Sequence, residues 1–155
     1  MNPGSESFSI VAWIQGGAPG QVIMSQSNSS GGRGVLPGCI WFGTNPSNGK
    51  LMTGLMDTTV GVLESGYIIT DGQWRHIGLV FDRVTMRRHL YVDGVEVAAD
   101  TDFIGGVQTT GDLNIGVGQT PDAGTFFSGL IVDVRIYDVA LTAEDIKVLS
   151  QYATA

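Results

Sequence analysis

The carboxylates of this chain are the first candidates for chemistry, and their spacing does not suit bond cleavage. Glycoside hydrolysis needs two carboxylates, about 5 Å apart in retaining enzymes, one as the acid and one as the nucleophile. The sequence has four glutamates, which are Glu6, Glu64, Glu96 and Glu144. None of them belongs to a Glu-x-Asp-x-x-Glu pattern. We therefore expect no enzyme activity.

The histidines and the cysteine are not placed for catalysis either. His76 and His89 have no cysteine or carboxylate at the spacing of a zinc site. Ser128-Gly129 lacks the Gly-x-Ser-x-Gly turn that exposes a nucleophilic serine. Cys39 is the single cysteine, and its apolar neighbours indicate a buried thiol. We interpret His76 as a packed strand histidine and Cys39 as an inert one.

Sugar binding is the chemistry for which candidate residues remain. A lectin site presents a flat aromatic ring to the apolar face of a pyranose, and amides and carboxylates to its hydroxyls. Trp41 precedes a polar loop, so an indole and several amides can converge there. The candidate ligand-binding residues are Trp41, Asn45, Asn48, Asp57 and Tyr67. The alternative is that Trp41 packs against one sheet in the core.

The elements that must position these side chains are strands. From Asp71 to Ala98 apolar and polar residues alternate, and this period of two lets each strand bury one face. Asp93-Gly94 fits a two-residue type I′ hairpin turn, which needs positive φ at both residues. Strands are predicted at residues 7–15, 20–27, 38–44, 50–57, 66–70, 74–82, 87–93, 95–99, 112–118 and 126–138.

One helix completes the prediction. Thr142 can cap its N-terminus, with Asp145 three residues later as in a capping box. Ile146 and Leu149 give the helix an apolar stripe. Short strands separated by turn residues are typical of a sandwich or barrel. The sequence therefore predicts an all-β single domain over residues 1–155, with two antiparallel sheets and a short C-terminal helix.

The composition excludes several classes of partner. Asp and Glu number 15 against 8 Lys and Arg, which gives a net charge of -7. Nucleic acid is not expected, because affinity for it depends on clustered Lys and Arg, and the arginines at 83, 87 and 88 are interpreted as a solvated hairpin end. No apolar run reaches the roughly 20 residues that cross a bilayer. Residues 1–5 do not resemble a signal peptide, and we expect a cut point inside a longer chain there.

Four segments resemble the laminin-G-like, concanavalin A-like jelly rolls. Residues 8–13 are similar to the family's F-T-I-S-A-W, residues 74–82 and 90–94 to its W-H-H-V, Y-D and L-Y-V-D-G, and residues 129–141 to its G-x-I-D-E-V-R-I-Y and A-L. The resemblance implies an antiparallel jelly-roll sandwich. It also implies a non-catalytic, carbohydrate-binding (lectin-like) module of a larger extracellular or cell-surface protein. The alternatives are a protein–protein adhesion module and a structural spacer that accompanies an enzyme.

The resemblance also bears on the aromatic residues and on calcium. Trp13 and Trp74 fall on framework positions of the family, so both are expected in the core. Relatives often bind calcium through an Asp that follows the Ile of the last long strand, but Val132 stands there. Asp133 is expected to pair with Arg135. No cofactor is predicted, and calcium stays open for a loop site from Asp57, Asp100, Asp102 or Asp122.

The family usually has one more strand before the Phe8 segment, paired with the last long strand. Only seven residues precede Phe8, so the strand near 126–138 is expected to lack that neighbour. Unpaired strand edges recruit partners. We expect this edge to be covered by another copy of the chain, in a homo-oligomer, or by the N-terminal tail. Alternation along this strand predicts a common core face for Leu130, Val132, Val134 and Ile136.

Overall fold

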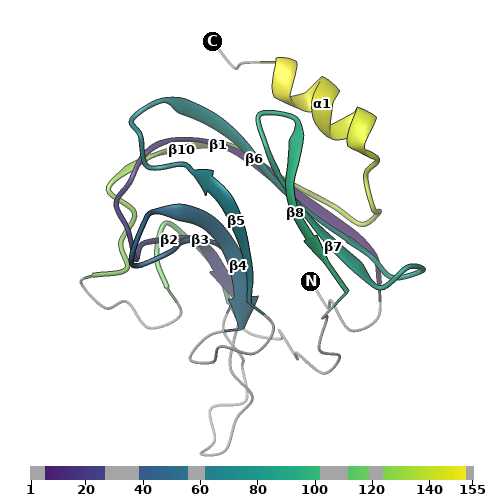
Figure 1. The fold of residues 1–155 in the computed structure, drawn as a ribbon, viewed down its shortest axis with the longest axis horizontal. Helices are drawn as coiled ribbons and strands as arrows, with labels where there is room; N and C mark the ends of the chain where they lie inside the picture. The colour runs from purple at the N-terminus through teal and green to yellow at the C-terminus, as the bar shows by residue number, and fades with distance from the viewer. Residues whose placement is uncertain (1–5, 27–38, 56–61, 102–111, 119–123, 153–155) are drawn as a thin grey trace, which may run out of the picture.

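The computed structural model describes residues 6–26, 39–55, 62–101, 112–118 and 124–152. These residues form two five-stranded antiparallel sheets and one helix (Figure 1). The strands are β1 (Phe8–Gly16), β2 (Val22–Gln26), β3 (Cys39–Thr44), β4 (Lys50–Leu55), β5 (Leu63–Ile68), β6 (Trp74–Asp82), β7 (Arg87–Val92), β8 (Val95–Asp100), β9 (Leu113–Ile115) and β10 (Gly129–Tyr137), and the helix is α1 (Ala143–Gln151). The predicted all-β sandwich with a C-terminal helix is confirmed.

The two sheets bring together strands that lie far apart in the sequence. Sheet A has the strand order β10-β1-β6-β7-β8, and sheet B has the order β5-β4-β3-β2-β9. β1 pairs on one side with β6 and on the other with β10. Figure 1 shows α1 lying across sheet A, on the side away from sheet B. We call that side of sheet A its outer face. No helix among the described residues is long and apolar enough to span a membrane.

The main core lies between the sheets and follows from the alternation of each strand. Every second residue of β1 and β6 points inward, including Ile10, Ile14, Ile77 and Leu79, which are fully buried. Burying each such side chain contributes roughly 1.5–3 kcal/mol relative to leaving it exposed. A register slip of one residue would turn all of them to the outer face. The pairing of β1 with β6 is therefore strongly determined.

A second apolar cluster holds α1 on the outer face of sheet A. Ile146 of α1 packs on Val11, Val80 and Tyr91. The predicted capping box is present, because the Thr142 side chain accepts from the Asp145 amide and the Asp145 carboxylate accepts from the Thr142 amide. The helix is thus fixed in position over β1, β6 and β7.

The β7–β8 hairpin has the turn that the sequence predicts. Asp93 has a φ of 51° and Gly94 a φ of 81°, as a type I′ turn requires. A methyl group on Gly94 would lie 2.5 Å from the Ser150 hydroxyl of α1. The hairpin therefore packs directly against the helix, at a distance that only glycine allows.

β10 departs from simple alternation through a β-bulge. Val11 pairs with Arg135 but Trp13 pairs with Val132, so two residues of β10 stand opposite one residue of β1. Asp133 lies in this bulge with a φ of 52°, in the left-handed region that Asp tolerates better than most residues.

The bulge overturns the predicted core face of β10. Ile131 and Val134 pack against the core between the sheets. Leu130 and Val132 lie on the outer face, opposite Gln15 and Trp13, and are exposed. Ile136 pairs with Ile10 on the inner side but is 43% exposed on this edge strand. The expectation that alternate residues from 130 to 136 share the core face is therefore wrong, because the extra residue reverses the alternation in the middle of the strand.

β10 also forms one edge of sheet A. Among the described residues its only ladder partner is β1. Residues 1–5 lie outside the described part of the chain. Coverage of this edge by a second copy or by the N-terminal tail stays a prediction.

Candidate functional site

Trp41 lies in the core and does not present its ring to solvent. The side chain is 2% exposed and packs edge-on against Phe8, with ring centroids 5.2 Å apart. The pairing of β3 with β4 is irregular between Ile40 and Gly43, and both Trp41 and Phe42 belong to the core. The prediction of Trp41 as an accessible stacking ring is wrong, and the core alternative is confirmed.

Asn45 and Asn48 build the turn between β3 and β4. The side-chain oxygen of Asn45 accepts the Ser47 amide at 2.8 Å, and its amide nitrogen donates to the Glu64 carboxylate at 2.6 Å. The side-chain oxygen of Asn48 accepts the Lys50 amide at 3.0 Å. Such bonds are what asparagine supplies in turns. Asp57 lies outside the described residues.

Tyr67 contacts a different group of residues. Its hydroxyl accepts from Arg75 at 3.2 Å, and the guanidinium lies 5.3 Å from its ring centroid. Arg75 also forms ion pairs with Asp71 and Asp93, which lower the pKa of Asp71 and raise that of Arg75. Tyr67 is thus fixed between β5 of sheet B and β6 of sheet A. The structure does not bring Tyr67 and the two asparagines into contact with a common group.

The outer face of sheet A carries the other two tryptophans. Trp74 is 43% exposed, so its predicted core position is wrong. Trp13 is half-buried and packs edge-on against His76, with ring centroids 5.1 Å apart. These residues alternate with the core positions of β1 and β6, and only part of their face is covered by α1.

Strand register places polar and apolar side chains beside these rings. Gln15 pairs with Trp74 on one side and with Leu130 on the other. One row further along, Trp13 lies between His76 and Val132. Directly paired residues project to the same side of a sheet. The result is a continuous surface with an exposed indole, an amide and two exposed aliphatic side chains.

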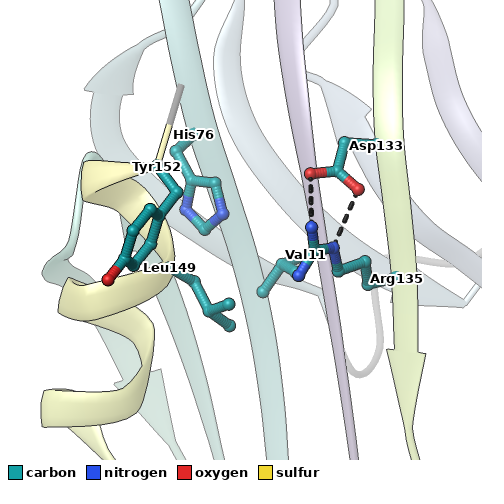
Figure 2. Close-up of a pocket in the computed structure, with 6 residues that line it drawn as sticks. All are labelled: Val11, His76, Asp133, Arg135, Leu149 and Tyr152. Carbon is teal, nitrogen blue, oxygen red and sulfur yellow. Dashed lines mark hydrogen bonds and ion pairs between the residues drawn. The ribbon is translucent and has the colours of Figure 1, made fainter. Parts of the chain in front are cut away.

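A cavity of about 190 Å³ adjoins this surface at the C-terminal end of α1. Figure 2 shows the imidazole of His76 near Tyr152 on one side, and Arg135 held by Asp133 on the other. Its walls come from β1, β6, β10 and α1, through Val11, His76, Asp133, Arg135, Leu149 and Tyr152. We call this cavity and the adjoining surface around Trp13, Gln15 and Trp74 the outer-face site.

Asp133 and Arg135 neutralise each other at one wall of the cavity. The Arg135 Nε donates to Asp133 Oδ1 at 2.8 Å, and Nη2 donates to Oδ2 at 3.0 Å. These two parallel bonds, and a contact with the Tyr137 hydroxyl, raise the pKa of Arg135. The predicted pairing of Asp133 with Arg135 is confirmed.

His76 is a neutral side chain at the floor of the cavity. It is 2% exposed, and burial lowers its pKa from 6.5 to about 4. Its Nδ1 has no hydrogen-bond partner among the described residues. Its main-chain amide donates to Asp93 Oδ1 at 2.9 Å, which ties the cavity to the hairpin turn. A neutral imidazole offers one donor and one acceptor. The predicted packed histidine is confirmed.

We expect the burial of His76 to make stability depend on pH. Because the pKa is about 4 when folded and near 6.5 when unfolded, the unfolded state binds more protons between these values. The free energy of unfolding should thus be largest above pH 6.5 and fall by up to about 3 kcal/mol as the pH drops to 4. Urea denaturation across this range checks it. His76→Gln should remove most of the dependence, and an unchanged slope in that variant would contradict the assignment.

The remaining candidates for chemistry have structural partners. Burial raises the pKa of Cys39 to about 12, as expected for an inert thiol. Arg88 is buried and donates to Asp100 at 2.8 Å, so this arginine is not part of a solvated hairpin end. Within the described residues, no three His, Cys, Asp or Glu side chains gather at a metal-binding distance. Of the proposed calcium ligands Asp100 alone is described, while residues 57, 102 and 122 are not.

The architecture now identifies the family. The model of the concanavalin A-like lectin/glucanases superfamily matches residues 2–147. The chain belongs to this superfamily. The resemblance of the four sequence segments is thereby confirmed. Sequence comparison with curated proteins gives no significant match.

Solved structures share the superfamily fold at low sequence identity. A Bacteroides ovatus protein assigned to carbohydrate binding is 21% identical, with a TM-score of 0.70 over 92% of this chain and 40% of its own. The CBM40 of a Ruminococcus gnavus sialidase is 16% identical, with a TM-score of 0.72 over 96% of this chain and 84% of its own. Domain 4 of AbnA, an extracellular arabinanase of Geobacillus stearothermophilus, solved with arabinotriose, is 20% identical, with a TM-score of 0.67 over 94% and 67%.

Sequence reasoning missed the residues of the outer-face site. A signal for Trp74 and His76 was present, because both alternate with the core residues Ile77 and Leu79 on β6. No such signal exists for the cavity, since its walls meet only after β10, β1 and α1 have packed.

Proposed function

We propose that this domain is a non-catalytic carbohydrate-binding module and that the outer-face site is its binding surface. The observation that carries the proposal is the exposed indole of Trp74 on an open sheet face, opposite the amide of Gln15. Apolar ring faces suit the C–H faces of a pyranose, and amides and charged groups suit its hydroxyls. Arg135 and Asp133 supply the charged groups beside the same surface.

The superfamily relatives support this choice of ligand class. The AbnA domain is named in complex with arabinotriose, and the sialidase CBM40 is named in complexes with sialyllactose. Two of the enzymes named among these relatives act on glycans, so a module of this kind can serve an enzyme without being one. We therefore place this domain in a larger extracellular or cell-surface protein.

Asn45, Asn48 and Tyr67 stay a second candidate surface for the sugar. Their amide oxygens and hydroxyl are already used within the protein, so they would contact a ligand only with their remaining bonding capacity. Asp57 shares this prediction, without a described position. We rank this surface below the outer-face site because the guanidinium of Arg75 already lies over the ring of Tyr67, its one aromatic residue.

Protein–protein adhesion is the second candidate function. The observation that favours it is the exposed pair Leu130 and Val132 on the outer face of β10, beside Gln15 and Trp13 of β1. Exposed apolar patches of this kind also mark protein interfaces.

A glycan array separates the two functions. The chain is applied first with calcium and then with a chelator, and we expect at least one glycan class to be retained in both conditions, because the outer-face site needs no metal. If glycan binding is lost when the chelator is added, the binding site would be assigned to a calcium-binding loop instead. A complete lack of glycan binding would overturn the carbohydrate proposal and leave adhesion or a spacer role.

A further inference from the structure

We propose that the cavity at the C-terminal end of α1 receives a single uncharged sugar unit and discriminates against acidic and amino sugars. This inference rests on the proposed function, and it names the chemical class of ligand for the outer-face site. It is carried by the size of the cavity, by the charges in its walls and by its unused hydrogen-bonding groups.

The size of the cavity fits one small ring. Its volume is about 190 Å³. Pockets that hold drug-sized ligands measure roughly 300–1,000 Å³. The apolar side chains of Val11 and Leu149 line it together with the exposed ring of Tyr152, and they suit the C–H groups of a pyranose. A longer glycan would continue over Trp13 and Trp74, which share the same face.

The charges around the cavity disfavour an acidic sugar. A carboxylate placed there would meet Arg135 together with Asp133, which already neutralises it, so this wall gives the ligand no net attraction to offset its lost hydration. It would also meet the C-terminal end of α1, which carries the negative pole of the helix dipole. The chain as a whole has a net charge of -7, which repels anions further.

The same ion pair disfavours an amino sugar. An ammonium group placed near Arg135 gains no attraction from the guanidinium, which Asp133 already neutralises. If the ammonium bound Asp133 instead, Arg135 would lose its partner. The ammonium would only replace one cation at Asp133 by another, so it gains no net charge contact to offset the loss of its own hydration. Neither sign of ligand charge therefore gains at this wall.

Hydroxyl groups match the bonding capacity that remains. A hydroxyl can donate and accept, and so can the neutral imidazole of His76. The Nδ1 of His76 is unpartnered among the described residues. Arg135 has five N–H groups, of which two donate to Asp133 and a further one is engaged by the Tyr137 hydroxyl. A polyhydroxylated, uncharged ring can use each of these groups without disturbing the ion pair.

The test is an NMR titration of the whole chain with matched monosaccharides. The neutral probes are D-glucose, D-galactose and D-mannose, and the charged probes are D-glucuronate and D-glucosamine. We expect saturable amide shifts at His76, Leu149 and Tyr152 with at least one neutral sugar. The charged counterparts should bind about tenfold more weakly, as expected for an uncompensated charge in the site.

Two variants and one control locate the effect. Tyr152→Ala should weaken binding of the neutral sugar, because it removes an exposed side chain that forms one wall of the cavity and leaves the core intact. Asp133→Asn keeps a residue that tolerates the left-handed φ but removes the negative charge, so it should reduce the discrimination against glucuronate. Arg87→Ala changes an exposed arginine of β7 outside the cavity. It should leave both the affinity for the neutral sugar and the discrimination against glucuronate unchanged.

Two results would overturn the inference alone. One is that glucuronate or glucosamine binds as tightly as the neutral sugars. The other is that the sugars shift the amide signals of other residues but not those of His76, Leu149 and Tyr152. Glycan binding would persist in both cases, so the proposed function would stand. Absence of any sugar-dependent shift, together with a blank glycan array, would overturn both.

Discussion

Trp41→Ala should lower the free energy of unfolding by about 3–5 kcal/mol, the range for removing a large aromatic side chain from a packed core. Trp41 is 2% exposed and packs edge-on against Phe8, so its removal leaves a cavity between the sheets. Urea denaturation at pH 7 measures the change, provided that the slope of the transition is unaltered. Sugar affinity, measured at urea concentrations well below the unfolding midpoint of the variant, should stay close to that of the unchanged protein.

The matched control is the tryptophan on the opposite side of sheet A. Trp74→Ala removes the same side chain from an exposed position, and surface substitutions usually cost within about 0.5 kcal/mol. The difference between the two variants therefore measures the burial of Trp41. If both variants cost equally little, the placement of Trp41 in the core would be contradicted.

Trp74→Ala should weaken glycan binding about 30-fold, equivalent to the roughly 2 kcal/mol that a central aromatic residue contributes to an interface. The physical reason is the loss of the flat apolar surface that covers one face of the sugar. Isothermal titration calorimetry with a glycan retained on the array measures the affinity. The melting temperature of the variant should stay nearly unchanged, since Trp74 is 43% exposed.

Phe126→Ala is the control for a general aromatic effect on binding. Phe126 is 50% exposed but forms a bridge with Val22 of sheet B and is not one of the residues of the outer-face site. Its removal should leave the affinity unaltered. Equal affinities of Trp74→Ala and the unchanged protein would move the binding surface to another part of the domain, with Tyr67 as the first alternative.

Features set by short-range chemistry could be predicted from the sequence. Asp93-Gly94 specified a type I′ turn because few residues adopt positive φ at low cost. Thr142 and Asp145 specified the start of α1 because their side chains satisfy amides that the helix leaves free. The alternation in β6 and β7 specified the meander for the same local reason.

Features that depend on the pairing of distant strands could not be predicted. The bulge at Asp133 appears only when β10 is placed against β1, and it exchanges the inward and outward residues of half the strand. Family position suggested a core role for Trp74, but the side chain starts β6 on the face that α1 leaves open.

The central position of β1 in sheet A has a consequence for how the chain folds. Its two neighbours, β6 and β10, both follow it in the sequence, and β10 lies more than a hundred residues after it. Pairing between distant segments is slow, because the loop between them must close before any contact forms. Before β6 is available β1 is an apolar strand with both edges open, and before β10 is available one edge stays open, the kind of species that associates with other chains. Association with other chains thus competes with folding most strongly before β10 has paired with β1.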